Sequence, residues 1–245
     1  DFNGDGFLDI AISNDAPDKK LIYLNDGKGN FKISSEFGIP EWPTRNLSIA
    51  DINADGLPDI ILANRGRSST SNYICINNGK GQFDAVCIPF ANYPSTTISP
   101  ADINKDGFID FVVPHRNGGQ SYVYVGSSAF IFSETNRIPF GSPDATIRMT
   151  GVADFNADNI SDIVTIDENK GVNIYFGKQD QSFSPGILIA DSTIVPYALA
   201  IADLNNDGKM DIIVGHEEAP SSVFFNDGTG LHYTMVPFGD SKGTV

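Results

Sequence analysis

Short runs of apolar residues recur along the chain, and each run follows a segment rich in Asp, Asn and Gly. Five runs hold this place: Ile10-Ala11-Ile12, Ile60-Ile61-Leu62, Phe111-Val112-Val113, Ile163-Val164 and Ile212-Ile213-Val214. Runs that are rich in β-branched residues and too short for a helix are typical of strands covered on both faces. No helix-length segment keeps an apolar period of 3.6, which excludes helical repeats.

Further strands are predicted on both sides of each run. A second apolar run, such as Leu21-Ile22-Tyr23-Leu24, ends in a hairpin turn, and three of these turns contain an Asn or Asp followed by Gly, as in Asn25-Asp26-Gly27. The strand after the turn alternates apolar and polar residues, as in Phe31-Lys32-Ile33-Ser34, which suits an edge partly in water. An extended stretch such as Leu47-Ser48-Ile49-Ala50 precedes each acidic segment. Each unit is therefore predicted to be a sheet of four antiparallel strands.

The acidic segment is a repeat that covers the whole chain. Asp-x-Asn-x-Asp begins at residues 1, 51, 102, 154 and 203, with spacings of 50, 51, 52 and 49. Four-stranded units of this size cannot bury both faces alone, but they can stack around an axis, which predicts an all-β fold and a β-propeller. The prediction is one propeller domain over residues 1–245, with five consecutive four-stranded antiparallel blades. A solenoid of stacked sheets is the alternative.

The repeated loop has the donor pattern of a calcium site. Calcium binds six to eight oxygen atoms, and side-chain oxygens at positions 1, 3 and 5, a turn at position 6, a main-chain carbonyl at position 7 and a final carboxylate at position 9 would wrap such an ion. The candidate ligands are, loop by loop, Asp1, Asn3, Asp5, Phe7 and Asp9; Asp51, Asn53, Asp55, Leu57 and Asp59; Asp102, Asn104, Asp106, Phe108 and Asp110; Asp154, Asn156, Asp158, Ile160 and Asp162; and Asp203, Asn205, Asp207, Lys209 and Asp211.

Up to five structural Ca²⁺ ions are expected as cofactors. An EF-hand closes its loop with an acid at position 12, whereas position 12 here lies inside a predicted strand, so the loop is expected in a β-hairpin. One site in each unit favours structural clamps over a single catalytic metal, which would keep an open position. Asn159 replaces glycine at position 6 of the fourth loop, and this site is expected to be the weakest.

These loops resemble the calcium loops of integrin α-subunit FG-GAP repeats and of the related VCBS repeats. The resemblance rests on Asp-x-Asn-x-Asp-Gly-x-x-Asp before an apolar strand and on Leu24-Asn25-Asp26-Gly27-Lys28-Gly29-Asn30-Phe31. It implies a propeller, usually of seven blades, with calcium held between the first and second strands of a blade by positions 1, 3, 5 and 9. The chain is then expected to be five blades of a larger ring, truncated at both ends, with the innermost strand of the first unit missing. A closed ring of five blades is the alternative.

The charge and composition limit the partners. The 245 residues carry a formal charge of −15, and this balance argues against a duplex nucleic-acid partner, which needs clustered Lys and Arg. No apolar run approaches the ~20 residues of a membrane-spanning helix. Loops of this kind fill where calcium is near millimolar, so the expected location is extracellular, either secreted or at the cell surface, with the periplasm as a further option.

A second group of residues is expected at the far end of each second strand, opposite the calcium loops. Polar groups and aromatic rings on loops over a rigid scaffold are where propellers bind ligands, here a glycan or an extracellular protein. The candidates are Trp42, Tyr93, His115, Arg116, Asp167, His216 and Glu217, and Phe90, Phe140 and Phe238 are expected in the same connecting loops. The alternative is that each is an ordinary solvated loop residue.

No catalytic residue is assigned, because the chain lacks a nucleophile elbow, a His-Glu-x-x-His zinc motif and a phosphate-binding Gly-Lys loop. The alternative function is a domain of a polysaccharide-degrading enzyme of the lyase type, with His115 and His216 at the ligand.

Cys75 and Cys87 lie in consecutive strands. If Ile76 pairs with Phe83, the two cysteines are about 10 Å apart, and free buried thiols are expected.

Overall fold

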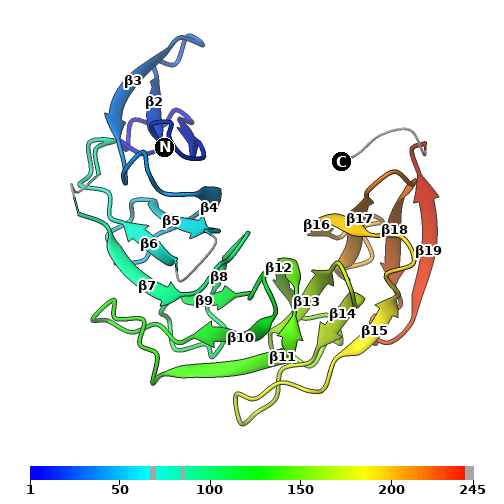
Figure 1. The fold of residues 1–245 in the computed structure, drawn as a ribbon. Helices are drawn as coiled ribbons and strands as arrows, with labels where there is room; N and C mark the ends of the chain where they lie inside the picture. Colours follow the sequence, from blue (N-terminus) through cyan, green and yellow to red (C-terminus); the bar gives the residue numbers. More distant parts are fainter. Residues whose placement is uncertain (67–69, 84–85, 241–245) are drawn as a thin grey trace. The chain divides into compact units, whose positions relative to one another are not determined.

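The computed structural model describes residues 1–66, 70–83 and 86–240, and every regular element in this part of the chain is a β-strand (Figure 1). The described strands form five separate sheets, one for each repeat unit. No described segment is a helix that could span a membrane. The all-β fold predicted from the sequence is therefore confirmed, and each sheet has the form of a propeller blade.

The first sheet has three strands in the order β1-β2-β3, and the other four sheets each have four. Its strands are β1 (Ile10–Ile12), β2 (Leu21–Asn25) and β3 (Phe31–Glu36). The second sheet contains β4 (Thr44–Ala50), β5 (Asp59–Asn64), β6 (Ser71–Cys75) and β7 (Ile88–Asn92). The third contains β8 (Ser99–Ala101), β9 (Asp110–Val113), β10 (Gly119–Tyr124) and β11 (Arg137–Ala145). Among the described residues, no fourth strand pairs with this first sheet, as the sequence predicted.

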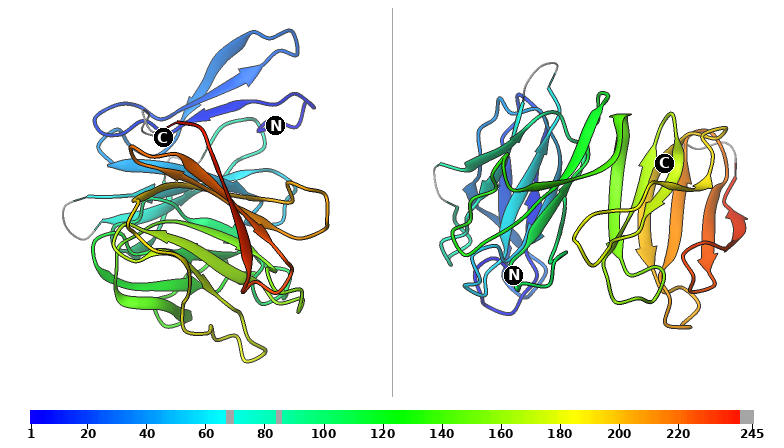
Figure 2. Two further views of the ribbon diagram at one scale, coloured as in Figure 1. Left: turned by 90° about the vertical axis from the view of Figure 1, so that its right-hand side faces the viewer. Right: turned by 90° about the horizontal axis from the view of Figure 1, so that it is seen from below.

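The last two sheets keep the same plan. The fourth contains β12 (Ile147–Ala153), β13 (Asp162–Asp167), β14 (Gly171–Tyr175) and β15 (Ile187–Ala190), and the fifth contains β16 (Pro196–Ala202), β17 (Asp211–His216), β18 (Ser221–Asn226) and β19 (Tyr233–Phe238). Consecutive strands are neighbours and pair antiparallel, and the twist of each sheet is visible in Figure 2.

The second strand of a unit is its most buried strand. Every residue of β5 and of β13 is buried, because apolar residues on both sides of the strand meet packed side chains. The outer strands β3 and β19 are mostly exposed, which suits their alternating sequences. The exception is β1, where Ile10 and Ile12 are 42% and 38% exposed and Ala11 is the residue that packs against the core of sheets one and two.

Contacts divide the chain into two compact units. The first comprises residues 1–102, 106–113 and 124–136, and the second comprises residues 103–105, 114–123 and 137–245. The core of the first unit joins sheets one and two through Phe2, Ile22, Phe37, Ile60, Leu62, Cys75, Phe83 and Cys87. The core of the second unit joins sheets four and five through Phe155, Val164, Ile166, Val172, Ile174, Ile212, Val214 and Phe224.

Cys75 and Cys87 form a disulfide, with their Cα atoms 4.4 Å apart, so the expectation of free thiols is wrong. The expected pairing of Ile76 with Phe83 is replaced by a bridge between Asn77 and Phe83. Further along, Ile74 pairs with Ile88, so the register changes by two residues between these pairs and brings the cysteines opposite each other. No described cysteine is free.

Candidate metal centres and ligand surface

Each acidic loop after the first joins the first strand of its sheet to the second. Residues 51–58 join β4 to β5, and residues 154–161 join β12 to β13. Two positions of every loop have left-handed backbone angles. Position 6 has φ between 62° and 89°, at Gly6, Gly56, Gly107, Asn159 and Gly208. Position 4 has φ between 57° and 74°, at Gly4, Ala54, Lys105, Ala157 and Asn206. The sequence analysis recognised the turn at position 6 and missed the one at position 4.

The carboxylate at position 1 organises the loop. In the second loop, Asp51 accepts hydrogen bonds from the backbone N–H groups of Asp55, at 3.1 Å, and Gly56, at 2.8 Å. The same two positions donate to Asp1, Asp102, Asp154 and Asp203 in the other loops. The side-chain amide of Asn53 donates to Asp55 at 2.9 Å, so the oxygen-bearing groups of positions 1, 3 and 5 lie on one turn.

The donor set fits calcium in kind. Carboxylate, amide and carbonyl oxygens are the ligands of this hard cation, and the turn holds three oxygen-bearing side chains together in every loop. No group of three His, Cys, Asp or Glu side chains among the described residues lies in a metal-binding arrangement. Position 3 is Asn in every loop, and the carboxylate at position 9 accepts backbone N–H groups, as at Asp59.

The carboxylate at position 9 is a structural staple. One oxygen of Asp59 accepts the N–H of Ile52 at 3.0 Å, and the other accepts the N–H of Asn77 at 2.8 Å. Asp162 makes the equivalent bonds to Phe155 and Gly177, both at 2.9 Å. Asp9 and Asp211 do the same in their units. Each carboxylate oxygen retains a lone pair, so this residue could hold a cation while it joins the loop to the end of the third strand.

Burial sets the electrostatics of position 9. Burial raises the pKa of Asp59, although its hydrogen bonds from Asn77 and Ile52 oppose the change. Burial likewise raises the pKa of Asp162 to about 6, against the hydrogen bonds from Phe155 and Gly177. Nearby loop carboxylates add to both shifts, since Asp55 and Asp51 repel charge on Asp59. These groups carry their charge at a cost that a divalent ion would offset.

The Asn of the Asn-Gly type of turn links neighbouring sheets. The side-chain amide of Asn77 donates to the carbonyl of Phe2, in the preceding loop, at 2.9 Å and to Pro58 at 3.1 Å. Asn226 likewise donates to Phe155 at 2.8 Å. Both Asn residues are buried. The recurrence of this Asn in the sequence was the signal for the bridge, but the sequence analysis interpreted it only as a hairpin turn.

The candidate ligand residues of the first unit are Trp42 and Tyr93. Trp42 stacks on Tyr73, with ring centroids 3.7 Å apart and an interplanar angle of 11°. The Tyr93 hydroxyl donates to the carbonyl of Val113 at 3.1 Å. Phe90 lies on β7 and is buried, so its expected loop position is wrong.

In the second unit, Arg116 belongs to a buried ionic cluster. Its guanidinium group pairs with Glu168, which also pairs with Arg148. The guanidinium carbon of Arg148 lies 3.9 Å from the centroid of the Tyr197 ring. Burial opposes charge on Glu168, but the two arginines outweigh burial and lower the pKa of this carboxyl below its usual 4.5.

The Asp167 carboxylate accepts hydrogen bonds from the turn that follows it and from Thr146. It is 2% exposed and accepts hydrogen bonds from the backbone N–H and hydroxyl of Thr146, both at 2.7 Å. The N–H groups of Asn169 and Lys170 donate to it as well. These bonds close the end of β13 and hold the start of β12 against it.

The two histidines lie at the ends of second strands, as expected. The backbone N–H of His115 donates to the Ser121 hydroxyl at 2.9 Å, and burial lowers the pKa of its imidazole. His216 is 5% exposed, and its Nδ1 lies 2.9 Å from the carbonyl oxygen of Pro220. Glu217 is exposed and its backbone N–H donates to the carbonyl of Val195.

Phe140 and Phe238 lie on strands, contrary to expectation. Phe140 is buried on β11 and packs edge-on against Tyr175. Phe238 ends β19 and is 46% exposed. The structure therefore brings together Arg116 and the turn that carries Asp167 and Glu168, whereas the other candidates hold separate places at strand ends.

Comparison with known proteins gives consistent matches. A family model described as the FG-GAP-like repeat matches residues 1–62, 51–113, 102–165 and 154–214. Integrin alpha-6 of Gallus gallus is 25% identical over 236 residues, covering 89% of this chain and 20% of the relative. A T-cell immunomodulatory protein homolog of Plasmodium falciparum is 23% identical over 264 residues, covering 87% of this chain and 36% of the relative. The chain thus spans well under half of either relative.

Two solved structures share the fold. An Agrocybe aegerita lectin, described as recognising non-reducing terminal N-acetylglucosamine, has a TM-score of 0.50 at 19% identity and covers 99% of this chain and 79% of its own. The V. cholerae biofilm matrix protein Bap1 has a TM-score of 0.53 at 18% identity, over 100% of this chain and 39% of its own. Identities this low show the fold alone.

Proposed function

Because the chain belongs to the family of FG-GAP-like repeat proteins, we propose that it is a calcium-stabilised binding module that works outside the cytoplasm and recognises a glycan or another protein. One observation carries the proposal. In all five loops the position 1 carboxylate accepts N–H groups from positions 5 and 6, which keeps oxygen donors together on one tight turn.

The proposed metal sites would act on stability. Positions 1, 3 and 5, the carbonyl of position 7 and the carboxylate of position 9 would hold the ion, and the bound charge would offset repulsion among three carboxylates in each loop. Position 9 already connects its loop to the third strand, as Asp59 does to Asn77. Fixing position 9 would therefore stabilise its own loop and the end of the third strand at once.

Thermal unfolding with and without calcium tests the metal proposal. Ions that bind only the folded state stabilise it by mass action, so excess EGTA should lower Tm by many degrees and added Ca²⁺ should restore it. Asp55→Asn should reduce the number of ions found by calorimetric titration, and Asp26→Asn, outside the loops and exposed, is the matched control. A Tm that EGTA leaves unchanged would refute the proposal.

In each compact unit, the proposed ligand surface is formed by the ends of the second strands and the loops beside them. Trp42 and Tyr93 in the first unit and His115 and Glu217 in the second support it, because they lie at or beside these ends and are at least partly exposed. An integrin and a lectin are among the similar proteins, which favours protein and glycan ligands over other classes. Parallel binding to a glycan array and to a panel of purified extracellular-matrix proteins separates the two, and absence of binding to both by the calcium-loaded protein would contradict the proposal.

The disulfide supports the proposed location. Disulfides persist in oxidising compartments, and Cys75 and Cys87 join β6 to the residue before β7. Extracellular calcium modules bind with Kd of about 10⁻⁴–10⁻³ M. The same titration therefore tests location, because a submicromolar Kd would point to a cytosolic sensor instead.

A further inference from the structure

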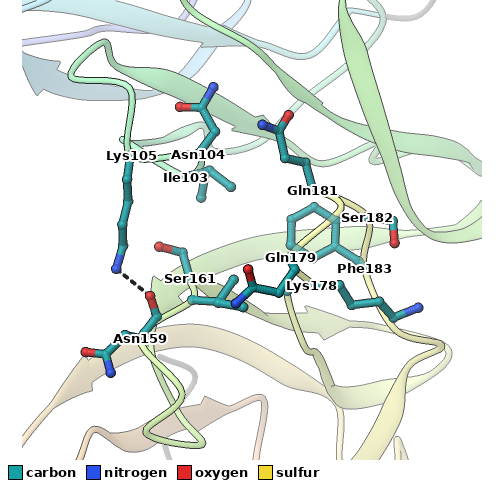
Figure 3. A pocket seen from close by; sticks show the side chains of 12 residues that line it. Ile103, Asn104, Lys105, Asn159, Ser161, Lys178, Gln179, Gln181, Ser182 and Phe183 are labelled. Atoms are coloured by element: carbon teal, nitrogen blue, oxygen red, sulfur yellow. Dashed lines mark hydrogen bonds between the residues drawn. The ribbon is translucent and has the colours of Figure 1, made fainter.

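A pocket of about 240 Å³ lies beside the third and fourth acidic loops, entirely within the second unit (Figure 3). Its wall on one side is Ile103 to Lys105, on another Asn159 to Ser161, and the hairpin of residues 177–183 completes it. The volume is below the ~300 Å³ at which drug-sized ligand sites begin. It therefore suits one small ring.

The pocket lies where the second and fifth units place a bridging side chain. The carboxylate at position 9 accepts the N–H of Asn77 in the second unit, of Asn226 in the fifth and of Gly177 in the fourth, so these residues are equivalent. The side-chain amides of Asn77 and Asn226 each donate to the carbonyl at position 2 of the acidic loop in the preceding unit, which is Phe2 for Asn77 and Phe155 for Asn226. Gly177 has no side chain to fill this place.

Gly177 is also held close to the fourth loop. A Cβ atom there would lie 2.4 Å from the carbonyl oxygen of Ser161, so the strand end approaches this loop in a way that only glycine permits. The bridge is absent from this position, and Ile103, the position 2 residue of the third loop, lines the open space instead. Glycine holds the same place in the third unit, where the N–H of Gly126 donates to Asp110, so the open space depends on Gly177 together with the residues that line it.

The lining offers an apolar surface with amide and hydroxyl groups around it. In the view of Figure 3, Asn104 and Gln181 lie on one side of the Phe183 ring, and the Gln179 amide and the Ser161 hydroxyl lie on the other. Gln179 and Gln181 are exposed, and their side chains make no hydrogen bond within the part of the chain that the structure describes. Amides and hydroxyls both donate and accept, which matches the hydroxyl groups of a sugar ring, whereas its C–H face can pack on an aromatic ring.

The charges around the pocket disfavour an anion. No Asp or Glu lines it, but the flanking loops carry Asp106 and Asp158, whose carboxylates would repel a charged ligand. Of the two lysines, Lys105 donates to the carbonyl of Asn159, and Lys178 directs its ammonium group away from the ring of Phe183. Neither is arranged to neutralise a carboxylate.

We propose that the pocket formed by the third loop, the fourth loop and the hairpin of residues 177–183 binds one uncharged sugar residue of a glycan, with Phe183 against the ring and the amides of Gln179 and Gln181 on its hydroxyl groups. This inference goes beyond the proposed function, because the pocket lies beside the acidic loops, away from the ends of the second strands. It also shares with that proposal the premise that the domain binds glycans.

The test titrates the calcium-loaded, ¹⁵N-labelled protein with methyl glycosides of N-acetylglucosamine, galactose, mannose and glucuronate. An uncharged glycoside should shift the side-chain amide signals of Gln179 and Gln181 and the backbone signals of residues 177–183. Gln179→Ala should weaken its binding about fivefold, since one lost hydrogen bond is worth about 1 kcal/mol. Met235→Ala, exposed on the outer strand β19 of the same unit and outside the pocket lining, is the control and should leave binding unchanged.

Each other outcome overturns the inference in a recognisable way. If no glycoside binds to the folded protein, the pocket is not a sugar site. The proposed function is then decided separately, by the glycan array and the panel of matrix proteins. If a glycoside binds but shifts signals near Asp167 and His216, the glycan function is supported and the pocket assignment is wrong. If glucuronate binds more tightly than every neutral glycoside, the uncharged class is wrong. Phe183→Leu, which keeps an apolar side chain against Phe140, should also weaken binding.

Discussion

The side-chain amide of Asn77 lies 2.9 Å from the carbonyl oxygen of Phe2, so a single turn residue fastens the second sheet to the acidic loop of the first. The same amide donates to Pro58, and its oxygen accepts the N–H of Gly79 at 3.0 Å. The bond to Phe2 is buried, with Asn77 and Phe2 both 2% exposed, so water is no ready substitute for it. Contact between neighbouring sheets is thus polar as well as apolar.

Asn77→Ala should destabilise the protein by about 1–3 kcal/mol, the cost of leaving buried carbonyl groups without donors. Asn25→Ala is the matched control, because Asn25 occupies the equivalent turn but donates only to Leu8 in its own unit. Chemical denaturation of the calcium-loaded protein measures both. Equal losses for the two variants would show that the bridge to Phe2 contributes nothing.

Asn159→Gly should stabilise the fourth loop. Asn159 has φ of 62°, a left-handed conformation that costs a residue with a side chain about 1 kcal/mol relative to glycine. The reverse change, Gly208→Asn, places the same residue at position 6 of the fifth loop, where φ is 82°, and should destabilise by a similar amount. Thermal unfolding with saturating calcium compares the two. A loss of stability in Asn159→Gly would mean that the Asn side chain has a favourable role.

Loss of the disulfide should lower the free energy of unfolding by about 2–4 kcal/mol, as for other short disulfide loops. Cys75 and Cys87 are buried in the first unit's core, so Cys75→Ala with Cys87→Ala keeps the site apolar while it removes the bond. Denaturation of this double variant under non-reducing conditions measures the loss, and mass spectrometry of the unreduced wild type shows whether the bond is present. An unchanged midpoint would contradict the expected contribution.

The sequence predicted the features that depend on local pattern. Apolar runs such as Ile60-Ile61-Leu62 gave the buried second strand, and the repeat gave the number of sheets and the short first one. These are set within a few residues, by alternation, turn chemistry and the recurrence of the acidic loop.

The features that the sequence analysis missed depend on register and on neighbours distant in the chain. Cys75 meets Cys87 because the register changes between the Asn77 bridge and the pairing of Ile74 with Ile88, and no local pattern announces such a change. The two N–H groups bound by Asp59 come from Ile52 in the acidic loop and from Asn77, which follows β6. The sequence predicted a carboxylate ligand at position 9, but the burial of this carboxylate and its hydrogen-bond partners follow only from packing.

The ion pairs of Glu168 should make the free energy of unfolding decrease at acidic pH. The pKa of its carboxyl is lowered in the folded state, so the ionised form stabilises the fold above the unfolded pKa of about 4.5, and this contribution is lost as the pH falls through the lower folded value. Glu168→Gln should cost about 1–3 kcal/mol at pH 7, because Arg116 is 4% exposed and loses its charged partner. The difference in free energy of unfolding between variant and wild type should narrow below pH 4.5, as followed by urea denaturation at several pH values.

Glu217→Gln removes an exposed carboxylate in the same unit, so it controls for general charge and should show no such narrowing. A gap that stays constant with pH would show that Glu168 acts by packing and not by its charge.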